Sequence, residues 1–126
     1  MRIRESIVSA GLAMLLTAAP VLAATYIEEP APNGGNTYRA VLDPDTFAVA
    51  DNVDFSTRAA KAVQMISVQG VVWDTALNRS PCGPKTLYGV NHAGCTAYAA
   101  NGHLRSAEGT HTIVDAIYGN WNKRTE

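Results

Sequence analysis

The chain has 126 residues, of which 47% are hydrophobic and 17% are charged, and its 11 acidic and 10 basic residues give a net charge of −1. This length suits one domain with a modest core, and the composition is ordinary for a globular protein. The charge balance offers no basic surface to meet phosphates, which excludes nucleic acid as the expected partner.

Residues 1–23 have the pattern of an export signal. A basic start at Arg2 and Arg4 precedes an almost wholly apolar segment from Ile7 to Leu22. A helix-breaking proline and a small-residue end then indicate cleavage after Ala23. The alternative is a membrane anchor, but the apolar run is shorter than the roughly 20 residues that a span needs. We therefore expect a periplasmic or secreted protein with no membrane span after signal removal.

The segment 24–36 is expected to be a flexible linker, because it combines charge with two prolines and two glycines and has no apolar period. Residues 37–126 would then form a single small domain. A β-branched and aromatic run predicts a strand over Thr37–Leu42. An aspartate followed by a proline predicts a short helix from Pro44 to Ala50, since aspartate caps helices and proline suits their first position.

The clearest helical pattern lies at 56–69. Apolar residues recur there at three- and four-residue spacing, which places them along one stripe of a helix. These residues are Phe55, Ala59, Ala62, Val63 and Ile66. Asp54 or Ser56 provides a cap, and Gly70 is a natural stop, because glycine enters the left-handed conformation without strain. We predict that this segment is the principal helix of the domain.

The apolar period then changes from 3.6 to 2. Strands are predicted over Val71–Asn78, Thr96–Ala100 and Thr110–Tyr118. The dipeptide Asn101-Gly102 predicts a type I′ hairpin turn. A helix followed by several strands, without regular βαβ alternation, predicts an α+β fold: a small, mainly antiparallel sheet with the 56–69 helix packed on it.

The chain has two cysteines, Cys82 and Cys95, with twelve residues between them. In an exported chain they are predicted to form a disulfide at the base of a loop. Closing such a loop stabilises a fold by about 3 kcal/mol in the chain-entropy model. The alternatives are a redox pair, whose usual C-x-x-C spacing is absent, and a metal site, which needs further ligands such as His92.

The predicted loop 82–95 is the leading candidate for a binding site, because a loop held at its base loses less ordering entropy when it binds. It mixes apolar, aromatic and hydrogen-bonding side chains. The candidate binding residues are Lys85, Leu87, Tyr88, Asn91 and His92.

His92, His103 and His111 lack the spacing of a helical metal motif, so neither a metal nor a cofactor is expected. His103 and His111 would converge if the predicted hairpin pairs their strands. With Asp74 or Asp115 they would then form a metal or acid–base site.

These patterns favour a small exported, non-catalytic binding or accessory module of the cell envelope, with an unknown protein or small-molecule ligand. One alternative is a small periplasmic hydrolase or metal-dependent protein that uses His103, His111 and an aspartate. Another is a structural subunit of an envelope complex, which an exposed apolar patch would favour.

Overall fold

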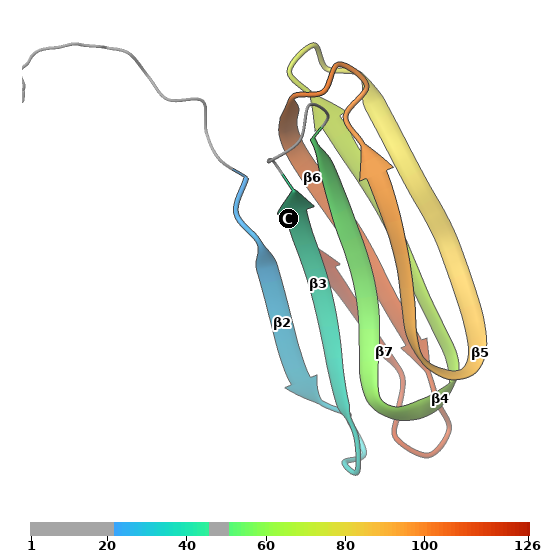
Figure 1. The fold of residues 1–126 in the computed structure, drawn as a ribbon. Coiled ribbons are helices and arrows are strands. Elements are labelled where there is room, and N and C mark those ends of the chain that lie inside the picture. The colour runs from blue at the N-terminus through green and yellow to red at the C-terminus, as the bar shows by residue number, and fades with distance from the viewer. Residues whose placement is uncertain (1–21, 46–50) are drawn as a thin grey trace, which may run out of the picture.

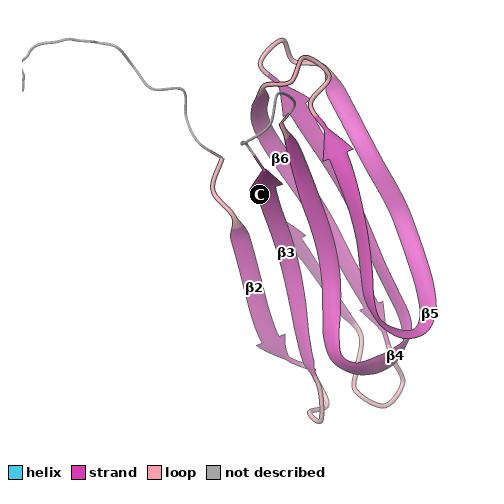
Figure 2. Ribbon diagram, viewed as in Figure 1, coloured by secondary structure: helices cyan, strands magenta, loops and turns pink. Residues whose placement is uncertain are grey.

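The computed structural model describes residues 22–45 and 51–126, and within them it contains strands and no helix (Figures 1 and 2). The strands are β2 (Thr25–Pro30), β3 (Thr37–Asp45), β4 (Asn52–Asp74), β5 (Arg79–Tyr98), β6 (Leu104–Val114) and β7 (Trp121–Thr125). The predicted signal segment lies almost wholly outside the described residues. So does most of the predicted helix 44–50, whose first two residues end β3.

All strand pairs are antiparallel, in the order β2-β3-β4-β6-β7, with β5 paired to β4. The long β4–β5 hairpin is doubled over (Figure 1), so that one sheet makes two facing layers. The first layer consists of β2, β3, residues 52–59 of β4 and residues 92–98 of β5. The second layer consists of residues 63–74 of β4, residues 79–90 of β5, β6 and β7.

The corner of β4 lies between Arg58 and Val63, where its register with β5 shifts. Three successive residues at this corner, 60–62, are exposed. The most deeply buried positions are odd-numbered before the corner and even-numbered from Ile66 onward. The extra residues therefore change which face of the strand is buried, as a bulge does.

The predicted helix 56–69 is wrong, and so is the α+β fold class: the described chain is all-β, and this segment is the middle of β4. The change of phase at the corner explains the error. Buried residues on either side of it, Phe55, Ala59, Val63 and Ile66, fall four, four and three residues apart. Two alternating half-strands with shifted phase thus imitate the stripe of one helix.

Four other features differ from expectation. The segment 24–36, expected to be a flexible linker, contains β2, which pairs with β3 along its whole length. The turn at Asn101-Gly102 joins β5 to β6, which are not paired with each other among the described strands. The predicted strands 71–78 and 110–118 end at Asp74 and Val114, where turns begin.

The core lies between the two layers. Its largest fully buried side chains include Tyr38, Leu42 and Phe55 from the first layer and Ile66 and Ile113 from the second. Burying one such aliphatic or aromatic side chain stabilises the fold by about 1.5–3 kcal/mol. The ring of Phe55 packs directly on Gly70, because a Cβ added at Gly70 would overlap that ring.

Gly70→Ala is therefore expected to destabilise the protein by about 1–3 kcal/mol, because an added methyl group overpacks the core against Phe55. Urea denaturation measures the change. Phe55→Leu in the same chain should recover part of the loss, because the two sites share one contact. Gly94→Ala is the matched strand control, since its added Cβ would meet no atom closer than 3.4 Å. Equal stability of Gly70→Ala and the parent would contradict this packing.

The outer edges of β2 and β7 are tied together by side chains. Thr25 Oγ1 donates to the Glu126 carbonyl at 2.7 Å, and Trp121 Nε1 donates to Glu29 Oε1 at 2.8 Å. Lys123 Nζ lies 3.1 Å from Glu29 Oε2. These contacts nearly close the two layers into a barrel on this side, whereas on the other side both layers end at β5.

Candidate functional site

The predicted disulfide is confirmed: Cys82 and Cys95 are bonded, with their Cα atoms 5.8 Å apart. The segment between them is not a loop, because it forms the corner and both arms of β5, paired along β4. Cys82 lies opposite Gly70 in the second layer and Cys95 lies opposite Phe55 in the first. The bond therefore clamps the two layers together at the β5 side. A disulfide of this kind suggests an oxidising, extracellular-type compartment.

The structure brings three of the five predicted binding residues to one cavity. Lys85, Leu87 and His92 line a cavity of about 720 Å3. Asn91 lines an adjoining cavity of about 450 Å3, which shares His92 with the first. Tyr88 lies elsewhere: it points to the opposite side of β5 from Leu87 and is 72% exposed.

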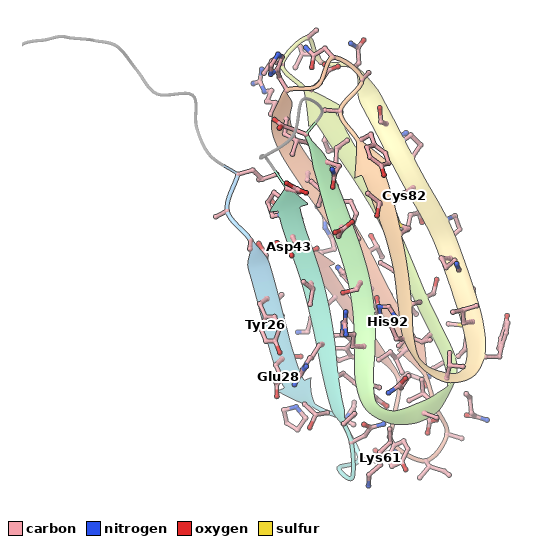
Figure 3. The ribbon with its side chains drawn as sticks, viewed as in Figure 1. Tyr26, Glu28, Asp43, Lys61, Cys82 and His92 are labelled. Atoms are coloured by element: carbon pink, nitrogen blue, oxygen red, sulfur yellow. A yellow bond between two sulfur atoms is a disulfide. The ribbon has the colours of Figure 1, made fainter. Side chains whose placement is uncertain are left out.

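The cavities lie over a row of side chains that crosses the first layer. Strand register pairs Glu28 with Arg39, Arg39 with Arg58, and Arg58 with His92. Four strands thus present one carboxylate, two guanidinium groups and one imidazole in a line. Glu28 on β2 and His92 on β5 mark its two ends (Figure 3).

The two arginines have different partners. Arg39 Nε lies 3.4 Å from Glu28 Oε1, and its guanidinium carbon lies 5.7 Å from the centre of the Tyr26 ring. Arg58 Nε donates only to Ser56 Oγ, at 3.4 Å, and no carboxylate of the described residues pairs with it. Like charges directly opposite each other destabilise a sheet. The row therefore contains one guanidinium charge that the described protein does not compensate.

His92 stands beside that charge. Burial and, to a lesser extent, the charge of Arg58 lower the pKa of the His92 imidazole. The ring is therefore neutral at pH 7 and offers one donor and one acceptor. Gly94, two residues along the same face, leaves the space beside the ring open, because a Cβ there would contact His92 Nε2.

Small or uncharged side chains, including Val41 and Ser56, also line the larger cavity. Beyond them, Asp43 lies directly opposite Asp54, which accepts a hydrogen bond from Thr96 Oγ1 at 2.6 Å. Arg39 and Asp43 are four residues apart on one strand, which is about 13 Å. The cavity therefore has a basic end and an acidic end on one face.

The two histidines of the alternative hydrolase or metal-dependent protein, His103 and His111, are not brought together. His111 is fully buried between the layers, and its Nδ1 and Nε2 lie 3.0 and 2.8 Å from the hydroxyl oxygens of Thr57 and Thr125. The Thr57 hydroxyl donates to the Ser67 carbonyl oxygen, so toward His111 it must act as an acceptor. His111 Nδ1 therefore carries the ring proton and donates to Thr57, and Nε2 accepts a hydrogen bond from Thr125. His103 is exposed in the turn before β6. Both ring nitrogens of His111 are thus hydrogen-bonded within the core and are not available to bind a metal.

Asp74 and Asp115 shape turns. Asp74 accepts backbone hydrogen bonds from Ala76, Asn78 and Asn101. Burial raises the pKa of Asp74, but the hydrogen bonds from Asn78, Asn101 and Ala76 together lower it.

Asp115 accepts backbone bonds from Gln64, Ile117 and Tyr118. The bond from Tyr118 lowers the pKa of Asp115 most. In both aspartates the carboxylate oxygens are occupied by the protein itself.

Within the described residues, no three His, Cys, Asp or Glu side chains are grouped as a metal site requires. None of the described segments forms a helix that is long and apolar enough to cross a membrane. No protein family, curated protein or solved structure matches the chain. The arrangement of side chains is therefore the basis for assigning a function.

Sequence reasoning missed Arg39 and Arg58, the two charges at the centre of the site. Arg58 lies in the segment 56–69 that was predicted to be a helix, and Arg39 lies in the predicted strand 37–42. Their pairing follows from the register of β3 with β4, which no local pattern in the sequence reveals.

Proposed function

We propose that the protein is a small, non-catalytic binding module of the cell envelope that recognises an anionic group at Arg58 and His92. The observation that carries this proposal is the row across the first layer, in which Arg39 and Arg58 lie opposite each other and only Arg39 has a carboxylate partner, Glu28. An anionic ligand at Arg58 would relieve this repulsion and gain charge-assisted hydrogen bonds. The imidazole of His92 supplies a neutral hydrogen-bonding group beside it.

A periplasmic or secreted location is part of the proposal. It is supported by the export-signal pattern of residues 1–23 and by the disulfide, which persists in oxidising compartments. Binding is favoured over hydrolysis because the aspartates and the buried histidine considered for catalysis are engaged in hydrogen bonds within the fold.

Arg58→Gln tests the proposal through two opposite effects. It should raise the stability of the free protein by about 0.2–1 kcal/mol at low salt, because it removes the opposed charge. It should also abolish the thermal stabilisation that a small dicarboxylate such as succinate gives the parent by mass action. Differential scanning fluorimetry at two salt concentrations measures both.

Arg105→Gln is the matched control, because Arg105 is an exposed arginine on β6 that lines neither cavity. It makes the same change of charge and should leave both readouts unchanged. If Arg58→Gln lowers stability and succinate shifts it as much as the parent, the proposed anion site is wrong.

A further inference from the structure

The two arms of β5 differ in how their outer edges are protected. β5 pairs only with β4, so its other edge carries no partner strand within the described part of the chain. Unpaired edges invite pairing with another chain unless prolines, lysines or bulges block them. The first arm contains Pro81 and Pro84, but the stretch 91–98 contains neither proline nor lysine. The unprotected edge is therefore 92–98, in the first layer.

The space beside this edge is shaped by the other arm. Lys85 and Leu87 pair with the buried residues Val68 and Ile66, so they lie on the inward-facing side of the second layer. Lys85 is nevertheless exposed, so its side chain reaches solvent beside the first layer. The 720 Å3 cavity is lined both by Lys85 and Leu87 and by residues 92–96. It thus runs along the free edge.

We propose that the free edge 92–98 binds an extended, acidic peptide segment of a partner protein as an additional strand of the first layer. Main-chain hydrogen bonds to the edge would supply affinity, and alternate side chains would supply specificity. On one face the peptide's side chains meet Arg58 and His92, and on the other they meet Leu87 and Lys85. Acidic side chains fit best at the Arg58 end, because Arg58 has no ion pair among the described residues. Asp43 and Asp54 line the other end of the same cavity.

This inference rests on the proposed binding function and identifies the chemistry of its ligand. The probe is an acetylated, amidated heptapeptide that alternates glutamate with valine. Its glutamates face the Arg58 side when its valines face Leu87. A lysine–valine peptide of the same length is the charge control, and succinate is the control for anion binding alone.

Backbone pairing has a distinct signature. A strand added to an edge uses the N–H groups of every second residue. N-methylation of one alternate set of peptide N–H groups should therefore abolish binding, and methylation of the other set should not. Calorimetry measures the affinities, and amide hydrogen exchange should show new protection at 92–98. Arg58→Gln should weaken binding of the glutamate–valine peptide by about tenfold, while Lys61→Gln, at the β4 corner, should not.

The possible failures are distinguishable. Equal binding of both methylated peptides, or affinity no greater than that of succinate, would overturn strand addition. If succinate still bound in a way that depends on Arg58, the proposed anion site would remain supported even though strand addition had failed. If instead the peptide binds with protection at 92–98 but is insensitive to Arg58→Gln, strand addition stands and the anion site is wrong.

Discussion

Replacement of Cys82 and Cys95 together by serine is expected to lower the free energy of unfolding by about 3 kcal/mol. The bond closes a chain segment with a sequence separation of 13, and the chain-entropy model gives about that value for this length. Such a loss is a large share of the roughly 5–15 kcal/mol that keeps a typical domain folded. The two layers should also separate more readily at the β5 side, because the disulfide joins its two arms there.

Urea denaturation with and without a reducing agent measures this effect. The double variant should match the reduced parent, and its midpoint should not respond to the reducing agent. Amide exchange should accelerate first at 92–98, while the paired centre of β6 stays protected. An unchanged midpoint after complete reduction of the parent would contradict a stabilising role for the bond.

The second large effect is a loss of stability in mild acid that depends on His111. Burial lowers the pKa of its imidazole from the ordinary 6.5 to about 4 in the folded protein. Between these two pH values the unfolded chain binds a proton that the folded chain does not, so stability falls with falling pH. The contribution of His111 to the free energy of unfolding is fully present above about pH 6.5. It decreases by about 3 kcal/mol as the pH falls to about 4.

Chemical denaturation from pH 7.5 to 4 checks this dependence, and His111→Gln should flatten it even though the substitution lowers stability at pH 7.5. His92→Gln is the necessary comparison, since the pKa of His92 is also lowered and acts in the same direction. The lowered pKa values of Asp74 and Asp115 affect the free energy of unfolding at pH values below the ordinary carboxyl pKa of 3.8. An unchanged acid profile in His111→Gln would show that a different group is responsible.

The sequence predicts the strand character of several segments better than their arrangement. The β-branched runs around residues 37–42, 71–74 and 110–114 are strands, as their alternation indicates. The failure at 56–69 came from treating the spacing of Phe55 to Ile66 as one period. A strand that changes its buried face at a corner has the same spacing, and only the long-range pairing of β4 distinguishes the two.

The segment 82–95 shows a similar limit. Its glycines and prolines resemble a loop, yet Gly83 and Gly89, both with positive φ, lie within the doubled strand β5. The disulfide was predictable because it depends on cysteine number and compartment. Of the residues that line the candidate site, Lys85, Leu87 and His92 lie in one stretch of the sequence and were proposed from it. The arginines that complete it come from two other strands, and their position depends on register.

The most direct test of the proposed function is a titration of the isotope-labelled protein with succinate, followed by NMR of its arginine and histidine side chains. We expect the guanidinium signals of Arg58 and Arg39 and the imidazole signals of His92 to shift together, with one common dissociation constant. Those of Arg105 and Arg124, which lie outside both cavities, should stay in place. Shifts spread evenly over all arginines, or none at Arg58, would contradict an anion site on this face.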